Sequence, residues 1–158
     1  MKRALVLTVS DRGHAGQMPD QSGPAVAGLL AGAGFEVGPV QIVPDERDLI
    51  VEALTRAAAA GYDLVVTTGG TGVGARDLTP QATSSVLDFE VPGIAEAMRR
   101  SGFEKTPLAA LSRGVAGVRH GTLIVNLPGS VRGATDSLAA VLPALPHAVQ
   151  LLKGDTRH

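Results

Sequence analysis

The segment from Leu64 to Pro80 constrains the fold of this chain more than any other stretch. It begins with an apolar run that predicts a buried strand, and it continues into a loop with four glycines between positions 69 and 74. Because glycine has no Cβ, the N–H groups of such a loop can approach a phosphate or a heterocycle closely. Thr79 and Pro80 then predict a helix start, with the threonine hydroxyl as N-cap and the proline at the first helical position. Asp77 is therefore expected just ahead of a helix N-terminus, where a carboxylate tends to stay ionised.

Two known glycine-rich nucleotide motifs can be compared with this loop. A Walker A loop requires a lysine and a hydroxyl residue after its last glycine, and Ala75 and Arg76 stand there instead, which excludes it. The dinucleotide fingerprint is met formally by Gly70-x-Gly72-x-x-Ala75, but that motif follows the first strand and runs directly into a helix. Pro80 marks a later helix start, so an NAD(P)-dependent oxidoreductase is the minor alternative.

The apolar pattern alternates between strand and helix along the chain. Apolar runs followed by turn residues predict strands at Ala4–Val9, Val37–Val43, Leu64–Val66 and Leu123–Val125. Helical spacing predicts helices at Pro24–Ala33, Glu46–Ala60, Pro80–Leu87, Gly93–Arg100 and from Val131 onward. Pro143 and Pro146 should break or kink the last of these. This order predicts parallel strands joined by right-handed crossovers.

A hairpin is expected next to the last of these strands. His120 and Gly121 separate the stretch Ser112–Arg119 from Thr122–Val125, and two residues suffice for a tight turn between antiparallel strands. We therefore expect an α/β fold with three layers: a mostly parallel open sheet, helices on both faces, and an added antiparallel hairpin. One domain spanning residues 1–158 accounts for this length.

Composition excludes several classes of function. Fourteen Lys and Arg residues oppose 15 Asp and Glu residues, so no net field favours nucleic acid or an anionic membrane as a partner. Cysteine is absent, which excludes disulfides and thiolate sites, and the four histidines have no metal-ligand spacing. The apolar run Ala4–Val9 is too short for a signal segment or a membrane span, so we expect a cytoplasmic protein.

Polar residues follow the predicted strands, and in an open α/β sheet such positions meet at one edge. Asp11, Asp45 and Asp77 are expected to converge there, with Arg12, Arg76, Arg113 and Arg132 nearby. Carboxylate oxygens suit Mg²⁺, while glycine amides and arginines neutralise phosphates. Since no protein nucleophile is evident, phosphoryl or nucleotidyl transfer fits, because it depends mainly on positioning and charge.

Each of these polar positions also has a purely local interpretation. Asp45 could cap the helix that begins near Glu46, and Asp77 could be an Asx-turn residue. Ser10 and Asp11 could simply end a strand, and the stretch 126–129 could be only a turn. Capping and catalysis are compatible, so local sequence leaves these alternatives open.

An ordered series of motifs from about Leu5 to Leu152 resembles the molybdopterin adenylyltransferase family, which includes bacterial enzymes of molybdenum cofactor synthesis and the N-terminal domain of gephyrin. The glycine loop joined to an Arg-Asp-x-Thr-Pro segment is the most specific part of the resemblance. The matching stretches are Val9-Ser10-Asp11-Arg12, Val43-Pro44-Asp45-Glu46, Thr67-Thr68-Gly69-Gly70-Thr71-Gly72, Arg76-Asp77-Leu78-Thr79-Pro80, Leu111-Ser112-Arg113, Leu123-Ile124-Val125-Asn126-Leu127-Pro128-Gly129-Ser130 and Leu142-Pro143-Ala144-Leu145-Pro146-His147-Ala148.

The resemblance implies transfer of AMP from Mg-ATP to the terminal phosphate of molybdopterin, with release of pyrophosphate. It also implies a homotrimer and a molybdenum-insertion partner protein. By matching motif, Asp45 and Asp77 would be catalytic and would hold Mg²⁺. The substrate and nucleotide contacts would come from Ser10, Asp11, Gly70, Thr71, Gly72, Ser112, Asn126, Pro128 and Gly129. A non-catalytic molybdopterin-binding paralogue or scaffold is the alternative within the same fold.

Overall fold

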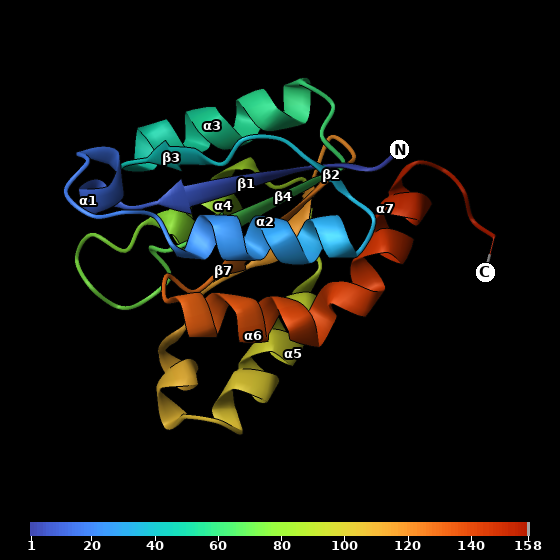
Figure 1. Ribbon diagram of the computed structural model, residues 1–158. Coiled ribbons are helices and arrows are strands. Elements are labelled where there is room, and N and C mark those ends of the chain that lie inside the picture. The colour runs from blue at the N-terminus through green and yellow to red at the C-terminus, as the bar shows by residue number, and fades with distance from the viewer. Residues whose placement is uncertain (158) are drawn as a thin grey trace.

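Seven strands form one sheet in the computed structural model, which describes residues 1–157 (Figure 1). The strand order is β2-β1-β4-β7-β6-β5, and β3 also pairs with β1. The pairs made by β1 with β2, β3 and β4, and by β4 with β7, are parallel, whereas β6 pairs antiparallel with β5 and β7. The strands are β1 (Arg3–Val9), β2 (Glu36–Val37), β3 (Gln41–Val43), β4 (Leu64–Thr68), β5 (Phe89–Glu90), β6 (Ala116–Arg119) and β7 (Thr122–Leu127). The predicted fold class is confirmed.

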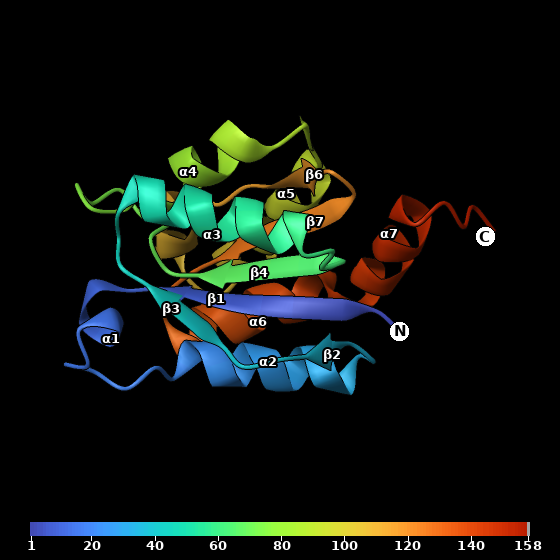
Figure 2. The ribbon, with the colours of Figure 1, turned by 90° about the horizontal axis from the view of Figure 1, so that it is seen from above.

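Helices cover both faces of this sheet, as the view from above shows (Figure 2). One face packs against α3 and α4, and the other packs against α2, α5, α6 and α7. Within residues 1–157, none of the helices has the length and apolar character needed to cross a membrane. The helices are α1 (Asp11–His14), α2 (Ser22–Gly32), α3 (Arg47–Ala59), α4 (Thr79–Val86), α5 (Pro92–Phe103), α6 (Val131–Val141) and α7 (Leu145–Leu152), with 3₁₀ turns η1 (Pro107–Leu111) and η2 (Leu142–Ala144).

The central strands are buried on both faces, which explains their continuous apolar sequences. Along β1, Leu5 and Leu7 pack into the core beneath α3 and α4, while Ala4 and Val6 pack into the core beneath α2 and α6. Strand β4 alternates in the same way, because successive side chains point to opposite faces. Two hydrophobic cores therefore share one sheet.

The predicted single strand Val37–Val43 is wrong, because the structure divides it into β2 and β3. Both pieces pair with β1, but Ala4 pairs with Val37 and Leu7 pairs with Gln41. The segment from β2 to β3 therefore has one residue more than the stretch of β1 that it faces. Gly38 and Pro39 fall within the interruption. Proline lacks the N–H that a continuous ladder requires, and this accounts for the break.

The hairpin prediction is confirmed, although its first strand is shorter than expected. Strand β6 begins at Ala116 rather than Ser112, because the backbone N–H of Arg113 donates to the carbonyl of Thr71 instead of pairing with β7. His120 (φ 46°) and Gly121 (φ 80°) both have positive φ, as a tight type I′ turn requires. The C-terminal helical region is broken near Pro143, as expected. The break expected at Pro146 is wrong, because Pro146 lies in the first turn of α7, where a proline is tolerated.

The predicted capping role of Thr79 is wrong. Helix α4 begins at Thr79 itself, and the N-cap residue Leu78 makes no side-chain capping bond. The Thr79 hydroxyl instead donates to the carbonyl of Gly69 at 2.9 Å, which ties the start of the helix to the start of the glycine loop. The helix begins only after the loop has turned through Asp77, so the direct loop-to-helix connection of a dinucleotide fold is not formed.

Two leucines of α3 give a matched test of the packing. Leu54 is fully buried, whereas Leu49 on the same helix is 38% exposed. We expect Leu54→Ala to lower the free energy of unfolding by about 2–5 kcal/mol through lost burial and a cavity. Leu49→Ala should lower it by less than about 1 kcal/mol. Urea denaturation measures both, and equal losses would contradict the assigned packing.

Candidate active site

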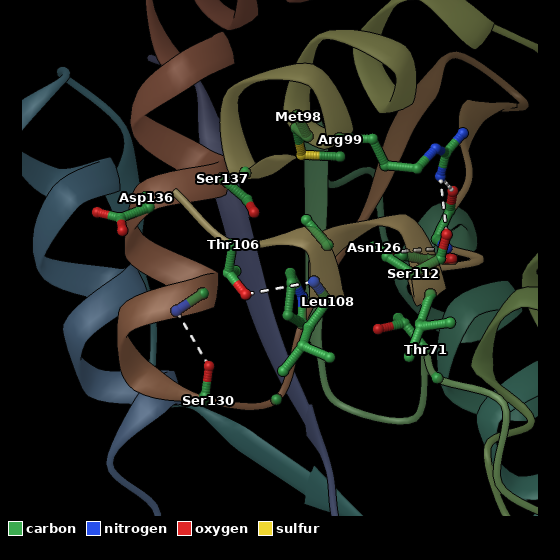
Figure 3. Close-up of a pocket in the computed structure, with 18 of the residues that line it drawn as sticks. Thr71, Met98, Arg99, Thr106, Leu108, Ser112, Asn126, Ser130, Asp136 and Ser137 are labelled. Atoms are coloured by element: carbon green, nitrogen blue, oxygen red, sulfur yellow. Dashed lines mark hydrogen bonds between the residues drawn. The ribbon is translucent and has the colours of Figure 1, made fainter. Parts of the chain in front are cut away.

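A cavity of about 990 Å³ lies at the carboxyl ends of β4 and β7, between the glycine loop, the N-terminal end of α6, and the α5–η1 segment (Figure 3). This is the edge at which the sequence predicts ligand binding. Ser10, Asp11 and Asp45 are not among the described residues that line the cavity. Of the predicted site residues, the lining includes Gly70, Thr71, Gly72, Asp77, Ser112, Asn126, Pro128 and Gly129.

The glycine loop has a backbone that only glycine adopts readily. Gly69 (φ +93°) and Gly70 (φ +70°) both have positive φ. A Cβ on Gly69 would collide with the carbonyl of Val9, and a Cβ on Gly70 would collide with the Thr79 hydroxyl. These glycines therefore let the loop lie directly against its neighbours while it faces the cavity.

The carboxylate of Asp77 lies over this loop. Its Oδ2 accepts a hydrogen bond from the N–H of Gly74 at 2.8 Å, and its own N–H donates to the carbonyl of Gly74 at 3.0 Å. The same oxygen lies 2.9 Å from the position that a Cβ on Gly72 would occupy. An Asx turn joins the side chain to an amide two residues further on, whereas this bond runs backward, so Asp77 is not an Asx-turn residue.

Asp45 lies beside the same loop from the β3 side. Its Oδ1 is 3.3 Å from the position that a Cβ on Gly70 would occupy. Its Oδ2 accepts from the N–H of Asp11 at 2.9 Å, and in return its N–H donates to Asp11 Oδ1 at 2.9 Å. Helix α3 has Glu46 as N-cap with no side-chain capping bond, so Asp45 is not a helix cap. The reciprocal bonds with Asp11 fix Asp45 instead.

Arg76 forms an ion pair with Asp11, so its guanidinium is not free to bind a phosphate. Its Nε donates to Asp11 Oδ2 at 2.7 Å, one Nη donates to Asp11 Oδ1 at 3.1 Å, and the same Nη reaches the carbonyl of Asp45 at 3.2 Å. The hydrogen bond from Arg76 holds the pKa of Asp11 below its ordinary value. Ser10 is also engaged within the chain, since its hydroxyl accepts from the N–H of Gly13 and caps α1.

Burial raises the pKa of Asp45, and the negative charges of Asp11 and Asp77 act in the same direction. Both candidate catalytic carboxylates approach the same glycine loop, Asp45 at Gly70 and Asp77 at Gly72. The hydrogen bond from the Asp11 amide and the charge of Arg76 oppose this rise. Two neighbouring carboxylates that repel each other favour the approach of a cation.

Asn126 lies near the end of β7, and its side-chain amide makes hydrogen bonds only with other groups of the protein. Its amide nitrogen donates to the hydroxyls of Thr67 and Thr83, at 3.0 and 3.1 Å, and its Oδ1 accepts from the N–H of Val115 at 3.1 Å. The residue is 1% exposed. Asn126 therefore joins β7 to β4 and α4, and it is one of the residues that line the cavity.

Comparison with known proteins decides the family. A family model described as a probable molybdopterin binding domain matches residues 5–147. The chain belongs to this molybdopterin-binding domain family.

Family members of known name and structure cover nearly the whole chain. A molybdopterin adenylyltransferase from Helicobacter pylori is 43% identical over 155 residues, which are 95% of this chain and 87% of the relative. A molybdenum cofactor biosynthesis bifunctional protein from Synechococcus elongatus is 41% identical over 96% of this chain, but the chain spans only 47% of that protein. The structure of the molybdopterin biosynthesis enzyme MoaB from Thermus thermophilus has a TM-score of 0.92 and 55% identity, with 98% of both chains covered. The predicted resemblance is confirmed.

Sequence reasoning missed one wall of the cavity of this molybdopterin-binding domain. Met98 and Arg99 on α5, together with Thr106 and Leu108 at η1, line that wall (Figure 3). Lys105, just before η1, also belongs to the lining. The Thr106-Pro107 pair repeats the helix-start signal of Thr79-Pro80, and here the threonine hydroxyl does accept from the N–H two residues on, at 3.2 Å. That signal locates η1, but it does not reveal that η1 faces the cavity.

The cavity carries both signs of charge. Lys105 lies 3.2 Å from Asp136 on α6, and Ser130 caps the N-terminus of α6 by accepting from the N–H of Gly133 at 3.0 Å. The ionisable side chains of the lining are Arg99, Lys105, Arg132, Asp77 and Asp136. Lys105, Arg132 and the N-terminus of α6 lie on one side of the cavity, where Asp136 is also present, and Asp77 lies on the glycine-loop side. The cations and the helix N-terminus suit an anionic ligand.

The ion pair between Arg76 and Asp11 predicts a specific dependence on pH. Arg76→Ala should raise the pKa of Asp11 toward 3.8, the ordinary value, as measured by NMR titration of its carboxyl carbon. Since the folded-state pKa is lowered, the stabilisation is present above the unfolded-state pKa and is lost as pH falls through the folded-state pKa. The difference in free energy of unfolding between wild type and variant should therefore shrink as the pH falls through and below 3.8, the ordinary pKa of the aspartate.

A second arginine provides the control for this experiment. Arg47 makes an exposed 3.6 Å contact with Asp48 on α3. Arg47→Ala should leave the titration of Asp11 unchanged. An unaltered Asp11 titration in Arg76→Ala would show that the ion pair does not persist in solution.

Proposed function

We propose that this chain transfers the adenylyl group of ATP to the terminal phosphate of molybdopterin, in molybdenum cofactor biosynthesis. The observation that carries the proposal is the approach of Asp45 and Asp77 to one glycine loop beside a large cavity. Relatives named molybdopterin adenylyltransferase, of which this chain covers 83% and 87%, support the same activity. The enzyme would be a nucleotidyltransferase.

The glycine loop supports the nucleotide part of the proposal. Gly70, Thr71 and Gly72 line the cavity, and the two glycines have no side chain to obstruct it, so the amides of this loop can face the phosphates of ATP. In the reaction, an oxygen of the terminal phosphate of molybdopterin forms a bond to the α-phosphorus. The bond from that phosphorus to the bridging oxygen breaks, and pyrophosphate leaves with the electron pair. The chain binds and orients both substrates, and no covalent intermediate with the protein is needed.

Asp45 and Asp77 fit Mg²⁺ as the metal of this reaction. Each has one carboxylate oxygen held by a backbone N–H, and carboxylate oxygens are the ligands that this ion prefers. Within residues 1–157, no set of three or more Asp, Glu, His or Cys side chains could hold a metal by itself. Two carboxylates suit an ion that arrives with ATP and keeps phosphate and water ligands. When bound, Mg²⁺ would neutralise charge on the phosphates.

The other wall supports a second, anionic substrate. Met98, Leu108 and Leu111 supply apolar surface that suits a flat heterocycle, and Lys105 and Arg132 supply positive charge for a phosphate. Homotrimer formation, a molybdenum-insertion partner protein, a cytoplasmic location and the single-domain assignment over residues 1–158 stay predictions.

One incubation tests substrate, co-substrate and reaction together. The protein is mixed with molybdopterin and Mg-ATP, and adenylylated molybdopterin is detected by mass, with pyrophosphate measured in parallel. Both products are expected. Molybdopterin binding without pyrophosphate release would overturn the enzyme proposal in favour of a non-catalytic binding protein, and binding of NAD(P) would favour an oxidoreductase.

Asp77→Asn tests the role of one carboxylate. The amide oxygen can still accept from Gly74, so the loop should keep its shape while the charge is lost. We expect kcat for adenylyl transfer to fall by about 100-fold or more, with the circular dichroism spectrum unchanged. Asp48→Asn removes an exposed carboxylate in the first turn of α3 and serves as the control. Undiminished turnover of the Asp77 variant would refute its catalytic role.

A further inference from the structure

Arg113 follows η1 and reaches the glycine loop from outside it. Its Nε donates to the carbonyl of Gly72 at 2.7 Å, and one Nη donates to the carbonyl of Asp77 at 2.7 Å. The other Nη reaches Gln81 Oε1 on α4 at 3.2 Å, and the backbone N–H donates to the carbonyl of Thr71 at 2.8 Å. One half-buried residue thus holds both ends of the segment from Thr71 to Asp77.

We infer that Arg113 is a positioning residue that presets the glycine loop and Asp77 for the nucleotide, an inference that rests on the proposed adenylyl transfer. A trans peptide points its C=O and N–H in opposite directions. Because the carbonyls of Thr71 and Gly72 point to Arg113, the N–H groups of the two following residues point away from it. The bonds of Arg113 therefore determine which way the loop presents its amides.

The same bonds fix the carboxylate of Asp77. The Arg113 guanidinium holds the carbonyl of Asp77, and the N–H of Asp77 is held by Gly74. With its backbone restrained on both sides, the side chain accepts from the Gly74 amide and stays over the loop. Arg113 itself is not among the described residues that line the cavity, so it acts through the loop rather than by touching the substrate.

The geometry requires arginine rather than positive charge alone. The planar guanidinium spreads its donors over a fixed fork, and here three nitrogens serve three separate oxygens. A lysine presents one nitrogen on a flexible chain and cannot span the carbonyls of Gly72 and Asp77 in the same way. Arg113→Lys therefore keeps the charge and removes the fork.

The test compares Arg113→Lys with Arg119→Lys. Arg119 is also half-buried and also donates to a carbonyl, that of Val86 at 3.0 Å, but it lies on β6 outside the cavity lining. We expect Arg113→Lys to lower kcat for adenylyl transfer by about 100-fold while KM for molybdopterin changes by less than about threefold. Arg119→Lys should keep the wild-type kcat. Added guanidinium should restore part of the kcat lost in Arg113→Ala.

A second measurement does not depend on activity. Hydrogen exchange followed by mass spectrometry should show that peptides covering residues 70–78 exchange about tenfold faster in Arg113→Lys than in wild type or Arg119→Lys. The melting temperature of the protein should stay the same. If the wild type makes no adenylylated molybdopterin, the proposed function fails, and loop exchange alone decides the role of Arg113. Wild-type kcat in Arg113→Lys, or unchanged loop exchange, would overturn the inference. If Arg113→Ala does not fold, the lysine variant carries the test.

Discussion

The parallel pairing of β4 with β1 on one side and β7 on the other is the constraint on which the site depends. In register, Thr8 pairs with Thr68, which in turn pairs with Leu127, so all three strands end at the same level. The glycine loop therefore emerges between the loop after β1 and the loop after β7. A Cβ on Gly129 would lie 3.2 Å from the Cα of Gly69, which shows how tightly these loops meet. Residues far apart in the sequence become neighbours through backbone pairing alone.

The sequence was sufficient for the parts of the molecule that follow from local pattern. The double burial of β1, β4 and β7 leaves continuous apolar runs, and the His120-Gly121 turn requires residues that accept positive φ. Asp45 and Asp77 could be selected because each follows a strand or a glycine loop. Local pattern failed where a single residue interrupts an element, as Pro39 does between β2 and β3.

The partners of polar side chains were not predictable in the same way. Arg76 and Arg113 appeared suited to phosphates, yet both bind oxygens of this chain that are tens of residues away in sequence. Asn126 follows a similar rule, since its three hydrogen bonds join β4, α4 and the segment before β6. Such contacts depend on tertiary structure, and composition or spacing carries no signal for them. The α5–η1 wall of the cavity was not predicted for the same reason, because periodicity does not reveal which face of a helix borders a cavity.

The crowding of Gly69 and Gly70 restricts how ligand preference in such a protein can change. Both positions have positive φ and no room for a side chain, so nearly any replacement there would distort the backbone before it touched a ligand. The α5–η1 wall has no such restriction: Leu108 is 69% exposed and Leu111 is 50% exposed. Substitutions that change what the cavity accepts are therefore tolerated better on the η1 side than at Gly69 and Gly70.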